Sequence, residues 1–297
     1  MITINPSELG NPKTHHYLLG AVGPRPICFA STIDNNGTPN LAPFSFFNVF
    51  SSNPPVAIFS PARSGKTGKQ KDTYNNVKNI PEVVINLVDY KMVEKMSLAS
   101  SPYGPEVDEF IKSGLTPIKS ETIRPFRVKE SPVQMECEVF NIMELGETGG
   151  AGNLIMCNIK RIHIQKDLLD NKEMIDQQKI DLVSRMGGNW YCRTDPNSMF
   201  EITKPITTCG IGVDSIPVDI FNSKVLSGND IGKLGGIEIL PNETTVNEYK
   251  LVELSELFIE LEDNPSELEN KLHQIAKSLL KENKLEEAWK TLLTFNN

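Results

Sequence analysis

The sequence predicts a mainly β protein with helical insertions and a helical extension at its C-terminus. Short apolar runs bounded by turn residues fill the first two thirds of the 297 residues. Over residues 155–164 the alternation of side chains is closer to a period of two than to 3.6, which is typical of a strand. Residues 251–297 instead carry apolar side chains every three or four positions, which is typical of amphipathic helices.

The first predicted hairpin begins at Arg25. Residues 25–33 are rich in Ile, Phe and Ala, Asp34-Asn35-Asn36-Gly37 supplies a turn, and 38–50 continues as one extended apolar run. Further strands are expected at 55–60 and 83–88. Both of these runs are continuously apolar, so we expect burial on both faces, inside a barrel that also packs against helices or a partner subunit.

Helices and a second hairpin follow in order. Pro and Gly breakers separate three helical patterns, at 71–80, 91–99 and 106–113. The second hairpin is expected from 133–145 and 153–165, because the glycine-rich segment 146–152 divides two runs of strand character.

Pro205 marks a change of character and gives the predicted domain boundary, with a first domain at 1–204 and an extension at 205–297. Residues 205–250 are expected to be short extended pieces. In the acidic tail, Ser266 and Glu269 form a capping box ahead of an apolar stripe, and a second stripe includes Trp289. Such stripes cover a core or a subunit contact more often than they bind a partner helix or a membrane surface.

Composition excludes several function classes. The chain has 30 Lys plus Arg against 38 Asp plus Glu, a net charge of −8, which argues against a nucleic-acid binder. The N-terminus lacks the apolar core of a signal peptide, and no run approaches the ~18 apolar residues of a membrane span. We therefore expect a cytoplasmic protein without a membrane partner.

No motif identifies a metal site or a catalytic group. The five cysteines form no C-x-x-C pair, and the four histidines form no H-E-x-x-H motif, so no metal is expected. Gly65-Lys66-Thr67 resembles the end of a phosphate loop, but Ser60 stands where the first glycine belongs. Catalytic residues stay unidentified.

Candidate binding residues gather between Arg25 and Asn76. A phosphate needs cations and hydroxyl or amide donors, and a loop that runs into a helix start supplies them. These donors are Arg63, Ser64, Lys66, Thr67, Lys69, Lys71 and Thr73. The alternative is a solvated lysine-rich loop, which is the commoner occurrence.

The order of these residues resembles the flavin reductase-like family of FMN-binding split barrels. The series runs from Arg25-Pro26 through Ala30-Ser31-Thr32, then Asn40-Leu41-Ala42-Pro43-Phe44-Ser45-Phe46-Phe47, to Lys71-Asp72-Thr73 and Val83-Val84-Ile85-Asn86. The resemblance covers roughly residues 13–204 and includes Glu136-Cys137, Asn153-Leu154 and the segment from Arg185 to Tyr191. It implies a Greek-key split β-barrel and a homodimer, with FMN near the subunit interface.

Carried over position by position, the resemblance implies contacts for the parts of FMN. Ser31 and Thr32 match ribityl or phosphate contacts, Asn40 and the segment Pro43–Phe46 match the edge that faces the isoalloxazine, and Lys71 and Thr73 match the phosphate element. The full candidate set is Arg25, Ser31, Thr32, Asn40, Pro43, Phe44, Ser45, Phe46, Ser60, Arg63, Lys71 and Thr73. Each also has a plain structural reading as a strand, core or surface residue, and Tyr191 fits either a flavin contact or barrel-edge packing.

The resemblance implies an FMN-dependent oxidoreductase, an NAD(P)H-driven flavin reductase that passes electrons to free flavin, another acceptor or a partner protein. A flavin accepts hydride itself, so the lack of an obvious acid–base pair is consistent with this. Two alternatives stay open, namely an electron carrier reduced by a partner protein and a non-catalytic flavin-binding protein. His163 is only an insecure match to a histidine that assists nicotinamide binding in some relatives. The sequence leaves open the choice of NADH or NADPH, the acceptor, whether FMN is a prosthetic group or a substrate, and the role of 205–297.

Overall fold

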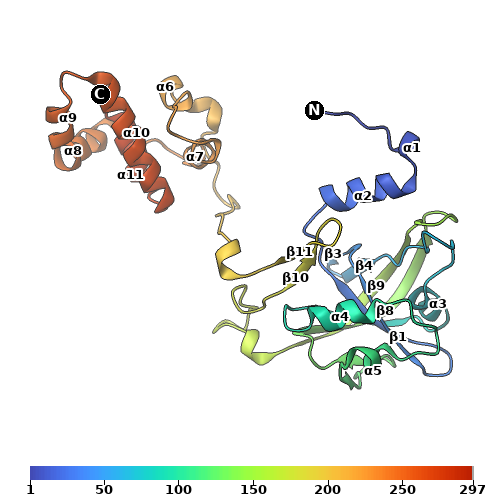
Figure 1. Cartoon of the computed structure of the whole chain (residues 1–297). Coiled ribbons are helices and arrows are strands. Elements are labelled where there is room, and N and C mark those ends of the chain that lie inside the picture. Colours follow the sequence, from blue (N-terminus) through green and yellow to red (C-terminus); the bar gives the residue numbers. More distant parts are fainter. Residues whose placement is uncertain (296–297) are drawn as a thin grey trace. The chain divides into compact units, whose positions relative to one another are not determined.

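The computed structural model describes residues 1–295 and divides the chain into two compact units (Figure 1). The division falls between Phe200 and Glu201, four residues before the predicted boundary. Within residues 1–295 no helix is both long and apolar enough to cross a membrane.

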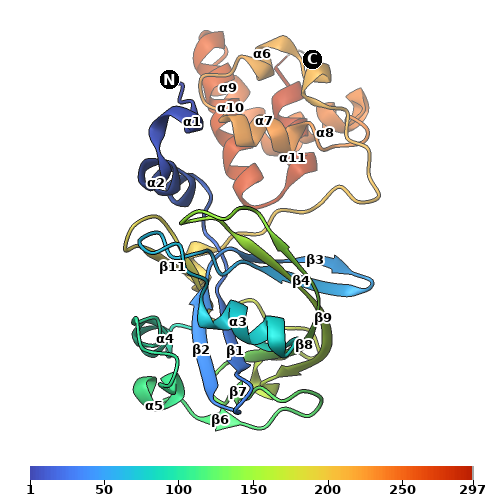
Figure 2. The same ribbon diagram turned by 90° about the vertical axis from the view of Figure 1, so that its right-hand side faces the viewer.

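The first unit is built around one seven-stranded antiparallel sheet that curls into a barrel (Figure 2). The strand order is β2-β1-β5-β8-β9-β4-β3, and every neighbouring pair is antiparallel. The strands are β1 (Cys28–Ile33), β2 (Pro39–Phe44), β3 (Phe47–Ser52), β4 (Pro55–Phe59), β5 (Glu82–Asn86), β8 (Val133–Glu144) and β9 (Asn153–Ile164). The predicted mainly β class and split barrel are confirmed.

The prediction of a single extended run over 38–50 is wrong. β2 ends at Phe44, the chain bends at Ser45 and Phe46, and β3 begins at Phe47. Since β2 and β3 occupy the two edges of the sheet order, the chain must leave one edge and enter the other at this bend. Neither Gly nor Pro marks the bend, so apolar patterning alone did not reveal it.

Burial on both faces is confirmed for β5 and not for β4. Val83, Val84 and Ile85 are all inaccessible to solvent, because β5 lies in mid-sheet between β1 and β8. In β4, Val56 and Ile58 are half-buried, because that strand lies next to the edge strand β3.

The barrel interior is closed by helix α3 (Asp72–Asn79), which the sequence predicted within one residue at each end. Its Val77 packs among Cys28, Ala30 and Phe59 in the interior core. The helix therefore lies directly against β1 and β2, where the candidate site residues are concentrated (Figure 2).

A second core lies on the opposite face of β1. Phe29 and Leu41 pack there with Met96 of α4 (Val93–Ala99) and Phe110 of α5 (Glu109–Ser113). The predicted start of α5 at residue 106 is too early, because Asp108 caps the helix by accepting a hydrogen bond from the Phe110 amide. Two short strands, β6 (Pro117–Ile118) and β7 (Arg127–Val128), pair beside them.

The outer edge of β2 is closed to further strand pairing. The Leu41 amide points outward and donates to Oε2 of the buried Glu109 at 3.0 Å. Residues two positions away share this orientation, and they are Pro39 and Pro43, which have no N–H. This edge therefore offers no free amide donor at any of the three positions.

The remaining elements of the first unit lie outside the barrel. They are α1 (Pro6–Leu9), α2 (Asn11–Ala21), β10 (Val183–Arg185), β11 (Tyr191–Arg193) and the 3-10 turns Lys166–Leu168 and Pro196–Ser198. β10 and β11 form a hairpin, and Arg25 forms a backbone bridge to Arg185 of β10. The hairpin is thereby tied to the entry of β1.

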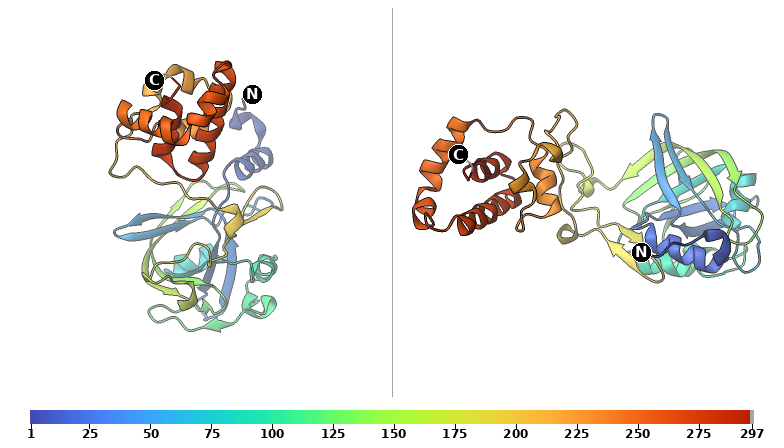
Figure 3. Two further views of the ribbon diagram at one scale, coloured as in Figure 1. Left: turned by 90° about the vertical axis from the view of Figure 1, so that its left-hand side faces the viewer. Right: turned by 90° about the horizontal axis from the view of Figure 1, so that it is seen from above.

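The second unit contains helices and, within the described residues, no strand (Figure 3), so the expected extended pieces are wrong from residue 213 onward, whereas 201–212 is irregular. Its helices are α6 (Val218–Phe221), α7 (Gly228–Leu234), α8 (Glu243–Glu253), α9 (Ser255–Glu260), α10 (Pro265–Lys281) and α11 (Leu285–Leu293), after a 3-10 turn at Val213–Ser215. The first two helices have only four and seven residues, and their shortness hid the helical period from sequence analysis.

The predicted capping box at Ser266 and Glu269 is also displaced. Asn264 caps α10 by accepting a hydrogen bond from the Glu267 amide, and Pro265 occupies the first helical position. The apolar stripes of α10 and α11 pack together around Trp289, which is fully buried. The prediction that these stripes cover a core is confirmed.

Candidate functional site

Four polar side chains form a hydrogen-bonded cluster between α3 and the β1–β2 hairpin. Asn40 donates through Nδ2 to Oγ1 of Thr32 at 3.1 Å and to Oγ1 of Thr73 at 3.0 Å. Asn76 donates to the same Thr32 oxygen at 3.1 Å. Because both hydroxyl oxygens accept, each retains its own hydrogen to donate to a further acceptor. We call Thr32, Asn40, Thr73 and Asn76 the Thr–Asn cluster.

Ser31 lies on the other face of β1. Neighbouring residues of a strand point to opposite faces, so Thr32 shares its face with Ala30 while Ser31 shares its face with Phe29 and the α4–α5 core. The Ser31 Oγ is buried and has no hydrogen-bond partner among the described residues. The structure therefore places Thr32 in the cluster and separates its predicted companion Ser31 from it.

Lys71 lies beside the cluster at the start of α3. It occupies the N-cap position, its side chain is exposed, and it makes no ion pair or hydrogen bond through that side chain within residues 1–295. The first amide groups of a helix have no intrahelical acceptor, and among the described residues no side chain caps the first turn of α3. A free ammonium, unsatisfied amides and the Thr73 hydroxyl together suit an anionic group such as a phosphate.

Ser60 belongs to a separate network at the end of β4. Its Oγ accepts from the Asn153 amide at 3.0 Å, and Asn153 Nδ2 donates to the Pro61 carbonyl and to Gln70 Oε1, both at 2.7 Å. A Cβ on Gly152 would lie 2.8 Å from the Ser60 Oγ. Ser60 thus joins the turn between β8 and β9 to the 61–70 loop.

Arg63 holds the same loop. Its guanidinium pairs with Glu144 at 2.8 Å and donates to the carbonyl oxygens of Gly146 at 3.2 Å and Gly68 at 3.4 Å. Tyr74 also donates to Glu144, and the bonds from Tyr74 and Arg63 lower the pKa of that carboxyl. With its donors engaged in this way, Arg63 positions the loop that leads to Lys71.

Arg25, another predicted contact, binds backbone. Its guanidinium donates to the carbonyls of Leu19, Val22 and Met186. These bonds join the end of α2 to the β10–β11 hairpin, and they set Arg25 apart from the Thr–Asn cluster.

The predicted segment Pro43–Phe46 borders a hollow of about 220 Å³. Ile27, Pro43, Phe44 and Met96 supply its apolar lining, and Ser45, Ser100, Arg185 and Tyr191 supply the rest. Phe44 also packs against Phe59 at a ring separation of 5.7 Å, while Phe46 stays exposed near His15. Met96, Ser100 and Arg185 were missed as candidates, because only the fold brings α4 and β10 to the end of β2.

The Thr–Asn cluster and the hollow lie at opposite ends of β2. Ser45 follows Asn40 by five positions, a distance of about 16 Å along a strand at ~3.3 Å per residue. One end offers a cation and hydroxyl donors, and the other offers apolar and aromatic walls. The two features also differ in face, because Asn40 pairs with Thr32 on the α3 side of the hairpin whereas Pro43 pairs with Phe29 on the α4–α5 side.

His163 pairs with Glu136 and belongs neither to the Thr–Asn cluster nor to the lining of the hollow. Its Nε2 lies 2.9 Å from Oε1 of Glu136, a carboxylate with no exposed side-chain surface. Burial alone would raise the pKa of Glu136, but hydrogen bonds from the Thr122 hydroxyl, the Glu121 amide and His163 lower it to about 2. The pair fixes the 119–124 loop on the sheet.

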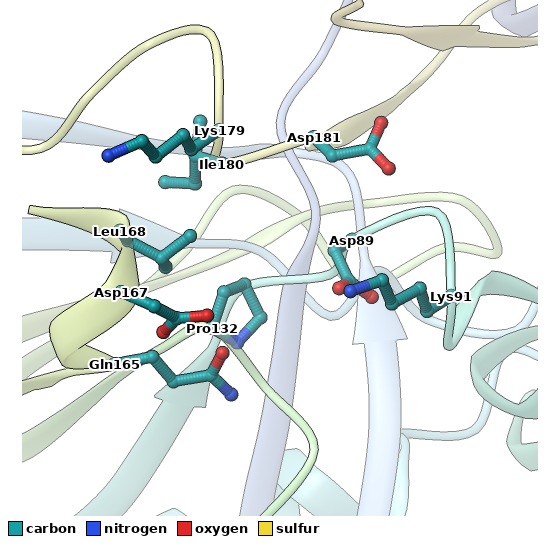
Figure 4. Close-up of a pocket in the computed structure, with 9 residues that line it drawn as sticks. All are labelled: Asp89, Lys91, Pro132, Gln165, Asp167, Leu168, Lys179, Ile180 and Asp181. Carbon is teal, nitrogen blue, oxygen red and sulfur yellow. The ribbon is translucent and has the colours of Figure 1, made fainter.

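A second hollow of about 240 Å³ contains none of the predicted contacts (Figure 4). Lys91, Lys179, Asp89, Asp167 and Asp181 supply its charged lining, with Asp181 paired to Arg193. Residues 1–295 contain no group of three or more His, Cys, Asp or Glu side chains arranged to hold a metal ion.

Comparison with known proteins finds a family match in the first unit. Residues 21–180 match the model described as "Flavin reductase like domain". An uncharacterized protein of Halalkalibacterium halodurans is 36% identical over 190 residues, which cover 63% of this chain and 90% of that protein.

Two solved structures share the fold and part of the sequence. Nitrilotriacetate monooxygenase component B from Bacillus cereus is 30% identical with a TM-score of 0.64, covering 68% of this chain and 98% of that one. The 2-nitrobenzoate 2-nitroreductase NbaA of Pseudomonas fluorescens is 26% identical with a TM-score of 0.63, covering 71% and 100%. These relatives are matched over nearly their whole length, whereas about a third of this chain lies outside each match.

Proposed function

The chain belongs to the flavin reductase-like family, and from this premise we propose that residues 1–200 bind FMN and act as an oxidoreductase driven by NADH or NADPH. The observation that carries the proposal is Lys71, which lies at the start of α3 next to Thr73 of the Thr–Asn cluster; among residues 1–295 its side chain is unpaired and no side chain caps this helix start. A cation, free amides and a hydroxyl at one point match the chemistry of a terminal phosphate.

Each part of the cofactor has a counterpart along β2. Lys71, Thr73 and the first-turn amides of α3 would hold the phosphate, and Thr32 and Asn40 would bond the ribityl hydroxyls. The segment Pro43–Phe46 would lie against the isoalloxazine, which when bound supplies hydride acceptance and electron transfer. The chain's own task is to orient the ring and to limit its access to water.

A titration with FMN tests the first part of this proposal. Binding at micromolar protein, read from flavin fluorescence and absorbance, is expected. Anaerobic addition of NADH and then NADPH should bleach the bound flavin near its absorption maximum. Binding without bleaching by either nucleotide would favour the carrier or the non-catalytic alternative, and absence of binding would refute all three.

We further propose that the protein works as a homodimer. Large apolar side chains are exposed on β3 and β8, among them Phe50 at 66% and Phe140 at 52%. Exposed apolar surface of this kind is typical of a subunit contact. Light scattering should give twice the chain mass, and Phe50→Asp should shift it toward the monomer; monomer mass for the wild type at all concentrations would contradict the proposal.

A further inference from the structure

The hollow at the end of β2 has a single charged lining residue, Arg185 of β10. Its guanidinium lies over the Tyr191 ring, 4.5 Å from the ring centre, and donates one long hydrogen bond of 3.4 Å to the Trp190 carbonyl. In the part of the chain that the structure describes, no carboxylate pairs with Arg185. Most of its donors are therefore available to a ligand.

A second positive charge lies close by without a carboxylate. Arg25 binds only backbone carbonyls among the described residues. Burial, and then the charge of Arg185, lower the pKa of Arg25, which places the two guanidinium groups within each other's field. Because no described carboxylate pairs with Arg25 or Arg185, the two guanidinium groups create a positive potential that attracts an anion.

The volume and walls of the hollow restrict what that anion is. At about 220 Å³ it exceeds the ~150 Å³ of a cavity known to hold benzene and falls short of the ~300 Å³ at which sites for larger ligands begin. Ile27, Pro43 and Met96 supply apolar contacts, and Tyr191 presents an aromatic ring. A ligand of one ring with one negative group satisfies both the volume and the charge.

We propose that this hollow binds a one-ring aromatic carboxylate, with the carboxylate held by Arg185 and the ring against Ile27, Pro43 and Met96. Because Pro43 and Ser45 belong to the segment Pro43–Phe46 that is proposed to lie against the isoalloxazine, the ligand would lie beside the flavin ring. In that placement the inference rests on the proposed function and names its substrate class. A guanidinium recognises a carboxylate through two parallel hydrogen bonds, which a neutral analogue cannot reproduce.

Calorimetric titration of the FMN-loaded protein tests the proposal, with benzoate, benzamide and acetate as probes. Benzoate should bind more tightly than either of the others. Arg185→Gln should weaken benzoate binding by roughly tenfold or more, the usual effect of losing a charged hydrogen bond, and leave FMN binding unchanged. Arg193→Gln is the matched control, because it removes the same charge from the same hairpin outside the hollow and should leave benzoate binding intact.

Other outcomes overturn the proposal. Equal benzoate affinity in the wild type and Arg185→Gln would remove Arg185 from the site, and acetate binding as tight as benzoate would reduce the hollow to a simple anion site. Loss of FMN from Arg185→Gln would assign the hollow to the flavin itself. If Arg185→Gln does not fold, Arg185→Lys retains the charge without the paired geometry and should weaken benzoate binding. If the wild type binds no FMN, the proposed function fails, and benzoate titration of the flavin-free protein still decides the role of Arg185.

Discussion

The two units of the protein differ most in charge. Residues 1–200 contain 21 acidic and 21 basic side chains, whereas residues 201–297 contain 17 acidic and nine basic ones, so the second unit carries the whole net charge of −8. The first unit places polar groups inside its fold, as in the Thr–Asn cluster, while the second buries a mainly apolar core around Trp289. The family match lies in the first unit alone. The candidate binding residues and the excess of acidic side chains therefore lie in different units of the chain.

Loss of Trp289 should break the second unit without affecting the first. Trp289→Ala removes the largest fully buried side chain, which also donates from Nε1 to the Leu234 carbonyl at 3.1 Å. A cost of about 3–5 kcal/mol is expected, enough to unfold a marginally stable helical unit. Circular dichroism melting should lose helical signal while the FMN titration stays unchanged. Trp190→Ala is the control, because Trp190 is 77% exposed; a fall in FMN affinity for Trp289→Ala would show that the units are coupled.

The acid stability of the first unit should depend on Glu136. Its pKa is lowered from 4.5 to about 2 in the fold, so its charge contributes stability above about pH 4.5 that is lost as pH falls toward 2. The shift corresponds to roughly 3 kcal/mol. Urea unfolding of Glu136→Gln should show this loss at pH 7 and approach the wild type near pH 2. Glu138→Gln, on the same strand but exposed, should change little; a constant difference at every pH would refute the electrostatic account.

The phosphate contact of the first unit depends on Lys71. Lys71→Ala removes a charged hydrogen bond worth ~1.5–3 kcal/mol, so FMN binding should weaken by roughly tenfold to somewhat over a hundredfold. Riboflavin lacks the phosphate, and its affinity should barely change. Comparison of the two dissociation constants in wild type, Lys71→Ala and Lys119→Ala measures this, since Lys119 is an exposed lysine outside the candidate site. Equal losses for both ligands would mean that Lys71 shapes the site generally, and no loss for either would make it a solvated charge.

The smallest effect is expected from His273 in the second unit. It is buried, Nδ1 lies 2.7 Å from Ser223 Oγ, and burial lowers its pKa below 6.5 against the opposing charges of Glu269 and Asp219. The unfolded chain therefore takes up a proton before the folded unit does, and stability falls as pH drops below 6.5. Thermal melting of the second unit between pH 7.5 and 5 should show this, and His273→Gln should flatten it. An unchanged slope in the variant would assign the effect to other groups.

The sequence predicted the fold where the chain pattern is local. The strands at 133–145 and 153–165 and the helix at 71–80 were found within one residue, because apolar period and turn residues mark them directly. The bend at Ser45 and Phe46 was not predicted, because it depends on which edge of the sheet β2 and β3 each join. The short helices between 218 and 253 escaped for a different reason, because stretches of four to eleven residues show too few turns to establish a period.

The candidate site divides in the same way. Thr32, Asn40 and Thr73 were named from their order in the sequence and meet in one cluster. Arg63 and Ser60 were named on the same grounds. Arg63 instead forms an ion pair with Glu144, and Ser60 accepts a hydrogen bond from Asn153, each partner more than 80 residues away in sequence. Residue type and order thus identified hydrogen-bond donors for a phosphate. Only the fold shows which of these donors lack a protein partner and can bind a ligand.

The closed edge of β2 affects how the protein aggregates at high concentration. A cross-β fibril grows when an exposed strand offers alternating donors and acceptors to the next chain. Pro39 and Pro43 lack the donor, and Glu109 has already taken that of Leu41. At Pro39, Leu41 and Pro43 an incoming strand would meet backbone carbonyl groups but no free amide donor. This edge of the sheet therefore cannot nucleate cross-β aggregation at high protein concentration.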